Sequence, residues 1–264
     1  MLQIQQVTKV FNPGTVNEKI ALNHINLHLS PGDFVCVIGT NGAGKSTLMN
    51  AIAGTFPVDH GHILIDKQDV TRLQEYQRAS LVGRVFQDPM AGTAPSMSIE
   101  ENMAIAYRRG QKRGLRMASN RRLREKFREA LTQLELGLEN RLQSKVGLLS
   151  GGERQALSLL MATFTEPKIL LLDEHTAALD PKRAQLIIEL TQKIVNKYHL
   201  TTLMITHNME HALRMGNRLI MMHEGEIILD LSKEEKEKMT VRDLIDAFER
   251  GRGEAFVDDR VVLT

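Results

Sequence analysis

This chain of 264 residues lacks a second cysteine, a long apolar run, an internal repeat and a low-complexity linker. Its one cysteine, Cys36, lies in the apolar stretch DFVCVIG and cannot form an internal disulfide, which suits a reducing compartment. No run reaches the ~18 apolar residues of a membrane span, and the opening MLQIQQVTKV lacks the apolar core of a signal peptide. We therefore expect a cytoplasmic protein with a buried structural thiol, whose membrane role would depend on a partner.

Net charge is also small, at +2, which excludes a chain that is basic over its whole surface. The exception is the segment 107–129, which holds ten Lys and Arg residues and two Glu. It could be a solvated helical face, a nucleic-acid patch, or a surface that faces a membrane partner near anionic lipid. Only Tyr107 and Phe127 could stack on bases, so we favour the membrane partner over the nucleic acid.

What is present is an alternation of apolar strands and amphipathic helices, which predicts an α/β fold. Residues 99–136 are predicted to be mainly helical and to form an inserted subdomain. The strands are expected at 24–30, 34–39, 61–66, 81–86, 168–173 and 201–206, with a hairpin at 218–230 that turns at Glu224 and Gly225. The helices are expected at 120–136 (Leu123, Phe127, Leu131 and Leu134 on one face), 181–198 (Leu186, Ile187, Leu190 and Ile194) and 240–250, where Thr240 and Asp243 form a capping box.

The stretch GTNGAGKST fits the pattern G-x-x-x-x-G-K-[ST] of a phosphate-binding loop. The glycines let backbone N–H groups surround phosphates, and the following helix directs its positive end at them. In this pattern the lysine reaches the terminal phosphates and the serine hydroxyl binds Mg²⁺. The residues expected to bind the nucleotide are Gly39, Thr40, Asn41, Gly42, Ala43, Gly44, Lys45, Ser46 and Thr47.

The stretch KILLLDEH predicts a buried strand that ends in two carboxylates, Asp173 and Glu174. Ligands of open α/β sheets bind at that edge. An acidic pair at the end of a strand is common by itself, but beside a phosphate loop it indicates a nucleotide site. We expect Asp173 to hold Mg²⁺ through water and Glu174 to act as the general base that orients a water molecule.

A second Ser-Gly-Gly turn begins a helix in the stretch LLSGGERQ. A plain helix capped by Ser150 is the simpler interpretation. Such a turn can also bind an anion through its N–H groups, its hydroxyl and the helix dipole. Because the helical insert separates the two loops, we expect two copies, arranged head to tail, to hold each ATP from both sides. The residues offered to the other copy's ATP are Ser150, Gly151, Gly152 and Glu153.

The order of these motifs, over about residues 2–230, resembles that of the ATP-binding subunit of ABC transporters. GTNGAGKST looks like the Walker A loop, LSGGE like the signature and ILLLDE like Walker B; VFQDP, AALD and MITHN look like the Q-loop, the D-loop and the switch. The resemblance implies that Gln87 contacts Mg²⁺ and the attacking water, that His207 contacts the γ-phosphate, and that Asp180 lies at the nucleotide. It also implies that Phe11 stacks on adenine. Taken alone, His207 would be an ordinary loop histidine and Phe11 a core phenylalanine.

The resemblance further implies the architecture: an ABC-type P-loop NTPase with a mixed sheet core, an N-terminal antiparallel β subdomain and an inserted helical subdomain. We expect an ATPase domain over 1–240, with the insert at about 88–149, and a helical tail over 241–264. Two residues depart from the family pattern: Glu153 stands where Gln is usual, and His175 where Pro or Ala is commoner. Neither removes a phosphate ligand, so only the rate is in question. The remaining histidines, among them His24, His28, His60 and His62, show no metal-binding spacing.

The expected function is therefore ATP hydrolysis that drives transport through a separate permease. The motifs look most like those of tryptophan/tyrosine-type uptake systems, which favours import of a small solute such as an amino acid. The expected partners are a transmembrane permease, a second copy of the chain and an extracytoplasmic solute-binding lipoprotein, but no nucleic acid. The protein would then lie on the inner face of the membrane through the permease. The alternatives are a soluble ABC ATPase that acts on nucleic acid or ribosomes, and a scaffold that binds ATP without hydrolysing it.

Overall fold

The structure, a computed structural model, describes residues 1–111 and 120–252 and consists of two compact units. The first unit joins Met1–Arg78 to the chain from Leu200 onward, and the second is Ala79–His199. The predicted insert at 88–149 lies within the second unit, and its boundaries stay a prediction.

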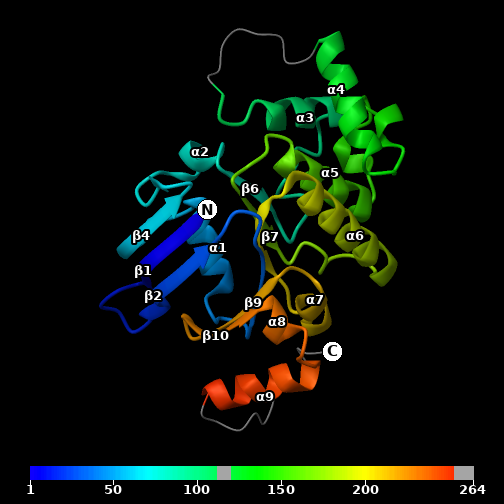
Figure 1. The fold of residues 1–264 in the computed structure, drawn as a ribbon. Coiled ribbons are helices and arrows are strands. Elements are labelled where there is room, and N and C mark those ends of the chain that lie inside the picture. Colours follow the sequence, from blue (N-terminus) through cyan, green and yellow to red (C-terminus); the bar gives the residue numbers. More distant parts are fainter. Residues whose placement is uncertain (112–119, 253–264) are drawn as a thin grey trace. The chain divides into compact units, whose positions relative to one another are not determined.

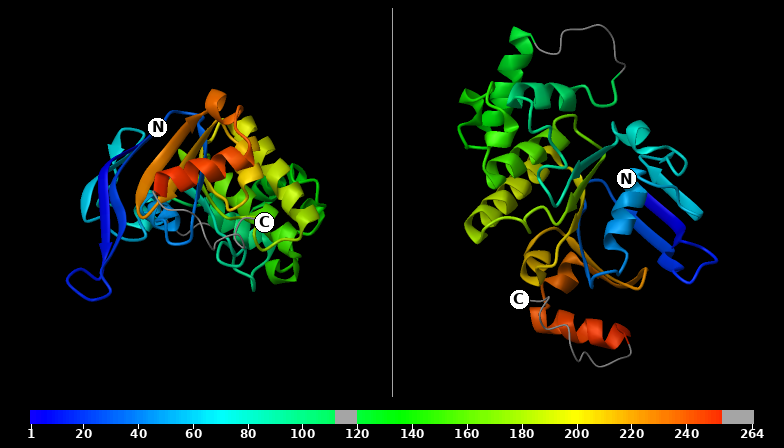
Figure 2. Two further views of the ribbon diagram at one scale, coloured as in Figure 1. Left: turned by 90° about the horizontal axis from the view of Figure 1, so that it is seen from below. Right: turned by 180° about the vertical axis from the view of Figure 1, so that it is seen from behind.

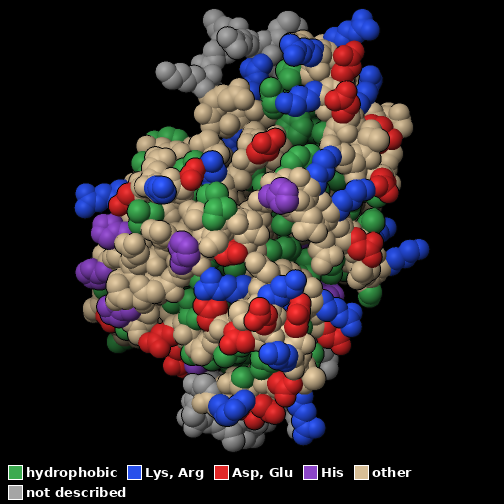
Figure 3. All heavy atoms as spheres, in the orientation of Figure 1, with side chains coloured by type: hydrophobic (Ala, Val, Ile, Leu, Met, Phe, Trp, Pro, Cys, Tyr) green, Lys and Arg blue, Asp and Glu red, His purple; other side chains and the backbone are tan. Residues whose placement is uncertain are grey.

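An antiparallel sheet opens the first unit, with the strand order β2-β1-β4-β5 (Figure 1). Along β2 the apolar side chains Ile25, Leu27 and Leu29 are buried and their neighbours are exposed, as the alternation predicted. Histidine side chains gather on the solvent face of this sheet (Figure 3). The strands are β1 (Leu2–Phe11), β2 (Lys19–Leu29), β4 (His60–Ile65) and β5 (Gln68–Asp69). The exposed histidines are His24, His28, His60 and His62.

The first unit also contributes four strands of a mixed sheet, in the order β10-β9-β3-β8. Strand β3 runs parallel to both β8 and β9, whereas β9 and β10 form the predicted antiparallel hairpin. Because β3 is buried on both faces, burial raises the pKa of its Cys36 thiol to about 12, which makes this thiol structural. The strands are β3 (Phe34–Gly39), β8 (Thr201–Ile205), β9 (Arg218–His223) and β10 (Glu226–Ser232).

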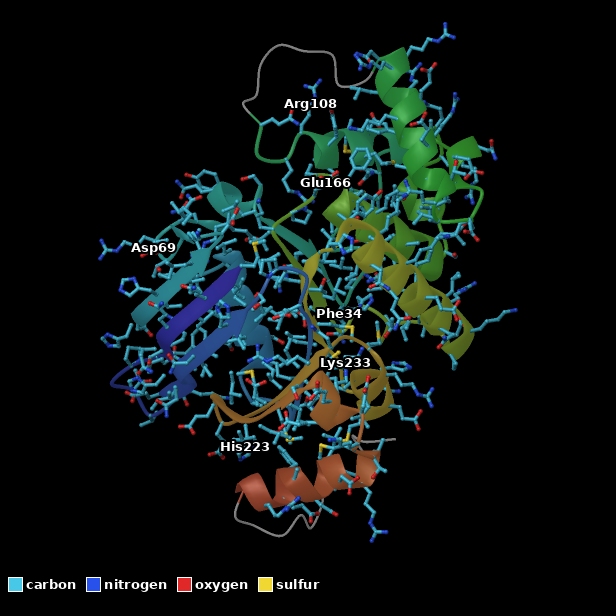
Figure 4. The ribbon with its side chains drawn as sticks, in the orientation of Figure 1. Phe34, Asp69, Arg108, Glu166, His223 and Lys233 are labelled. Carbon is cyan, nitrogen blue, oxygen red and sulfur yellow. The ribbon has the colours of Figure 1, made fainter. Side chains whose placement is uncertain are left out.

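The last helix of the first unit, α9 (Val241–Arg252), packs on α7 and β10 (Figure 2). It begins where the capping box predicted, since the Thr240 N–H donates to the Asp243 carboxylate over 2.8 Å. Its Phe248 ring lies 5.6 Å from the ring of His223, which lies between the hairpin and α9 (Figure 4). Residues 253–264 of the predicted tail lie outside the described residues. The other helices of this unit are α1 (Lys45–Ala53), α2 (Glu75–Arg78), α7 (Met209–Arg214) and α8 (Lys233–Lys236).

The second unit contains two parallel strands and a set of helices. Helix α6 spans the predicted range, and Asp180 caps it with Pro181 in its first turn. The strands are β6 (Val82–Val85) and β7 (Ile169–Asp173). The helices are α3 (Ile99–Tyr107), α4 (Arg121–Thr132), α5 (Gly151–Thr163) and α6 (Pro181–Tyr198), with the short 3₁₀ turns η1 (Leu138–Asn140) and η2 (Val146–Leu148).

Two details of the predicted helices are wrong. Helix α4 ends at Thr132 rather than continuing to 136, because the backbone turns left-handed at Glu135 (φ 57°) and Gly137 (φ 70°). Leu134 is nevertheless fully buried, as its apolar period predicted, although it lies outside the helix. On α6, Leu186 is 36% exposed, and the buried stripe begins at Ile187.

Candidate functional site

The predicted phosphate loop in the first unit connects β3 to α1 through three left-handed glycines. The φ angles are 146° at Gly39, 79° at Gly42 and 101° at Gly44. A Cβ at Gly39 would lie 2.2 Å from the Met222 carbonyl oxygen, and a Cβ at Gly44 would lie 2.5 Å from that of Ala21. The loop therefore needs glycine both for its conformation and for its close approach to two other strands.

The buried Lys45 lies inside this loop, and its ammonium donates to the carbonyl oxygens of Gly39 (2.6 Å) and Thr40 (3.0 Å). Helix α1 starts at Lys45 with no side-chain cap and no acidic residue in its first turn. Its leading N–H groups and positive dipole end are therefore suited to a phosphate. The next residue, Ser46, adds a hydroxyl, which is a hard oxygen ligand of the kind Mg²⁺ prefers.

His207 follows β8, the parallel neighbour of β3, so it lies at the same sheet edge as the phosphate loop. The Thr206 N–H donates to the Val37 carbonyl (3.2 Å), and the Asn208 side chain caps α7. His207 is thus held between a strand and a helix that begins two residues later. Its predicted contact with a γ-phosphate stays a prediction.

Phe11 lies at the end of β1 and is half-buried. Its ring contacts Phe56 edge-on at a centroid distance of 5.4 Å, and the Lys9 ammonium lies 5.5 Å from its centroid. Its predicted stacking on adenine stays a prediction.

In the second unit, the predicted Mg²⁺ ligand Asp173 ends β7, and its carboxylate accepts a hydrogen bond from Arg84 of β6 over 3.3 Å. The two side chains are 15% and 13% exposed, so the pair is largely shielded from solvent. Arg84 was not among the predicted site residues, although its place in the strand before Gln87 was an available signal. Glu174 follows with a left-handed backbone, φ 43°.

Gln87 follows β6, the parallel neighbour of β7, so Gln87 and the two carboxylates share one strand edge. The fully buried Gln155 of α5 donates to the Phe86 carbonyl over 3.3 Å, which connects the signature helix to the start of the Q-loop. The sequence analysis missed this residue as well. Asp180 accepts from the Arg183 N–H over 3.1 Å and so begins α6.

The predicted signature turn forms a reciprocal capping box at the start of α5. The Ser150 hydroxyl accepts from the Glu153 N–H (3.3 Å), and the Glu153 carboxylate accepts from the Ser150 N–H (2.7 Å). Arg141 also donates to that carboxylate, over 2.7 Å. Although partial burial acts to raise it, the pKa of Glu153 is lowered by its bonds to Ser150 and Arg141. Glu153, where the family usually has Gln, is therefore an anion neutralised by Arg141.

Arg141→Ala should lower ATP turnover about two- to fivefold, because a partly exposed ion pair contributes ~0.2–1 kcal/mol. The variant leaves the Glu153 charge uncompensated beside a turn that is expected to face phosphate. Steady-state phosphate release measures the effect, and Arg141→Ala with Glu153→Gln should recover the wild-type rate. A double variant as slow as Arg141→Ala alone would show that the charge is not the cause.

The basic helix α4 lies where Lys and Arg side chains gather in the second unit (Figure 3). Arg124 donates to the buried Glu100 over 2.7 Å, and its side chain is 52% exposed. Arg121 pairs only with Glu125 of its own helix among the ion pairs described, and is 95% exposed. Both arginines are exposed, so the solvated face and the partner-facing surface stay predictions, and residues 112–119 of the basic segment lie outside the described residues.

Within residues 1–111 and 120–252, no helix is long and apolar enough to cross a membrane. The same residues bring together no cluster of three His, Cys, Asp or Glu side chains suited to a metal ion. This finding does not bear on the predicted Mg²⁺ ligands, because two of them are the Ser46 hydroxyl and the Gln87 amide.

We compared the chain with known protein families, curated proteins and solved structures. The family model described as "ABC transporter" matches residues 22–177, more than half of the chain. The tyrosine transport ATP-binding protein of Clostridioides difficile (strain R20291) is 45% identical over 94% of this chain and 99% of its own length. The spermidine/putrescine import ATP-binding protein PotA of Pasteurella multocida (strain Pm70) is 33% identical over 89% of this chain and 59% of its own.

Solved structures share the fold. A dimeric structure of the ATP-binding cassette MJ0796, in a post-hydrolysis state bound to ADP and Pi, is 28% identical with a TM-score of 0.75. The match covers 88% of this chain and 99% of that one. The ADP conformation of MJ1267, an ATP-binding cassette of an ABC transporter, is 26% identical with a TM-score of 0.76, over 94% of this chain and 98% of that one. The chain therefore belongs to the ABC transporter family, as an ATP-hydrolysing cassette that combines an antiparallel β subdomain with a mixed sheet.

Proposed function

We propose that this cassette drives the import of tyrosine or a closely related amino acid through a separate permease. The observation that carries the proposal is the 45% identity to a tyrosine transport ATP-binding protein over nearly the full length of both chains. The proposed partners are a transmembrane permease, a second copy of this chain and a solute-binding lipoprotein outside the membrane. The cassette would act at the cytoplasmic face of the membrane through its contact with the permease.

ATP is held by the backbone N–H groups of the loop 39–44 and by the start of α1, with adenine on Phe11. Lys45, which lies inside the loop, stabilises the charge that develops on the transferred phosphoryl group. Its ammonium donates to the carbonyl oxygens of Gly39 and Thr40, and phosphate oxygens would take the place of these acceptors when ATP is bound. The hydroxyl of Ser46, the amide of Gln87 and the carboxylate of Asp173 would hold Mg²⁺, which neutralises phosphate charge when bound.

Hydrolysis requires a water molecule in line with the γ-phosphate. Glu174 accepts a proton from this water as its oxygen bonds to the phosphorus and the bond from phosphorus to the ADP oxygen breaks. Gln87 orients the water, and His207 donates a hydrogen bond to the γ-phosphate. The products are ADP and inorganic phosphate.

The turn Ser150–Gly152 serves the ATP held by the second copy, with Asp180 near the same interface. In the single chain the Ser150 hydroxyl accepts from its own helix, which leaves its proton available to donate to a phosphate oxygen. Gly151 and Gly152 add N–H groups with no side chain in the way. The dimeric state reported for the MJ0796 cassette supports this arrangement.

Ser150→Arg should abolish tyrosine uptake while the isolated monomer keeps its affinity for ATP. The reason is that the serine acts on the nucleotide of the opposite copy, and the long cation blocks that approach. The test deletes the gene in its host, restores it as wild type, Ser150→Arg or Thr132→Arg, and measures uptake of radiolabelled tyrosine and spermidine. Thr132→Arg adds the same group at an exposed residue of the same unit and should behave as wild type.

Two results would contradict the proposal in different ways. If the deletion lowers spermidine uptake and leaves tyrosine uptake unchanged, the proposed cargo is wrong. If purified Ser150→Arg monomer no longer binds ATP, Ser150 belongs to the nucleotide site of its own chain.

A further inference from the structure

His175, the residue directly after Glu174, is buried at 3% exposure in the second unit. Its Nε2 atom lies 3.0 Å from the hydroxyl oxygen of Thr191 on α6. Thr191 is fully buried as well. The two residues are sixteen positions apart, so this contact closes the segment after β7 back onto the middle of α6.

The direction of this hydrogen bond follows from the threonine. The Thr191 hydroxyl donates its single proton to the Ile187 carbonyl over 2.7 Å. Its oxygen can therefore only accept from His175, so Nε2 carries the proton that it donates. This hydrogen bond holds the imidazole ring in one orientation, and it gives both buried groups a partner inside the protein.

The backbone that this bond anchors is unusual. Glu174 has a φ angle of 43°, in the left-handed region that a residue with a Cβ seldom adopts. Such a conformation persists only where the surrounding structure holds it in place. The Glu174 carbonyl accepts from the Ala177 N–H over 2.9 Å, which makes a turn. The contact from His175 to Thr191 connects this turn to α6.

The far end of the segment is fixed separately. Asp180 caps α6 through the Arg183 N–H, so residues 174–180 are attached to α6 at its start and, through His175, in its third turn. Two attachments to one rigid helix define the path of the segment and therefore the direction in which Glu174 leaves the strand. An alanine or a proline at residue 175 could not make the second attachment, because neither has a side-chain donor.

We infer that His175 is a positioning residue, which holds Glu174 in its catalytic orientation through the hydrogen bond to Thr191. The inference rests on the proposed role of Glu174 as general base. A slightly misdirected base slows the chemical step without changing how the phosphate loop binds ATP. The effect should therefore fall on kcat and leave the KM for ATP unchanged.

The test compares pairs of variants in purified protein. His175→Ala removes the donor and Thr191→Val removes the acceptor while keeping the side-chain shape. Each should lower kcat roughly tenfold, as expected when a buried hydrogen bond is lost and its cost falls on the transition state. Their matched controls are His175→Gln, which retains an N–H donor, and Thr191→Ser, which retains the hydroxyl. Both controls should stay within about threefold of the wild-type rate, and all four variants should keep the ATP affinity of the wild type.

Several results overturn the inference: an unchanged kcat in Thr191→Val, a rise in KM that matches the fall in kcat, or a Thr191→Ser variant as slow as Thr191→Val. Should His175→Ala fail to fold, as its thermal melting would reveal, the Thr191 pair decides the matter alone. Glu174→Gln is measured in parallel to separate the two claims. If Glu174→Gln turns over at the wild-type rate, the proposed base is wrong and the inference falls with it. If only the variants at residues 175 and 191 are unaffected, the base stands and the positioning role is wrong.

Discussion

Glu174→Gln should bind ATP as tightly as the wild type and hydrolyse it at least about 100-fold more slowly, since a general base contributes ~10²–10⁴ to the rate. The amide has nearly the size of the carboxylate but cannot accept a proton from water. Lys45 and Ser46 are unchanged in this variant, so binding should persist. Steady-state phosphate release gives the rate, and equilibrium binding of ATP gives the affinity.

The same variant should accumulate as a dimer when ATP is present, because the closed state can no longer reset by hydrolysis. Size-exclusion chromatography with and without ATP measures this. A matched control is Glu166→Gln, which removes the charge of another left-handed glutamate in the same unit, one that is exposed in the turn before β7. An unchanged turnover rate in Glu174→Gln would exclude Glu174 as the base.

Gly44→Ala should weaken ATP binding about 100-fold or more. A Cβ there would meet the Ala21 carbonyl oxygen at 2.5 Å, and the φ angle of 101° is strained for alanine. The strain costs ~1–2 kcal/mol and the overpacking ~1–3 kcal/mol. The Ala21 carbonyl belongs to the backbone and cannot rotate away as a side chain could. The phosphate loop must therefore shift, which moves its N–H groups away from the phosphates.

The control for this variant is Gly14→Ala, in the hairpin between β1 and β2 of the same unit. Gly14 is also left-handed, at φ 74°, but an added Cβ would meet nothing within 4 Å. It should therefore lose some stability in thermal melting and no ATP affinity. If Gly44→Ala binds ATP as well as Gly14→Ala does, the close approach of the loop to Ala21 is not what ATP binding requires.

The elements that could be predicted from the sequence are those whose signals are local. The apolar stretch FVCVIG became β3, buried on both faces, and Glu224 with Gly225 turned the β9–β10 hairpin. Pro181 and the periodic apolar residues behind it gave both ends of α6. Each of these signals depends on backbone geometry or on a repeat within a few residues, so no distant contact was needed.

The two details of the helices that failed rested on an apolar period alone. The apolar period of 120–136 continued to Leu134, yet the helix ends at Thr132 because the backbone turns left-handed at Glu135 and Gly137, and Leu134 is buried without being helical. Leu186 fits the apolar stripe of α6, but the position is exposed. A periodic pattern shows which residues can be buried, and the packing of neighbouring elements decides which of them are.

For the site, the sequence by itself determined the phosphate loop, the acidic pair and the Ser-Gly-Gly turn, because their chemistry depends on residue types at fixed short spacing. Only the tertiary structure decided what surrounds them. Arg84 reaches Asp173 across 89 positions, Arg141 neutralises Glu153, and His175 meets Thr191 on a helix that the sequence predicted for other reasons. Such contacts depend on which side chains two separately folded elements bring within hydrogen-bonding distance in the interior. No spacing along the chain encodes that distance.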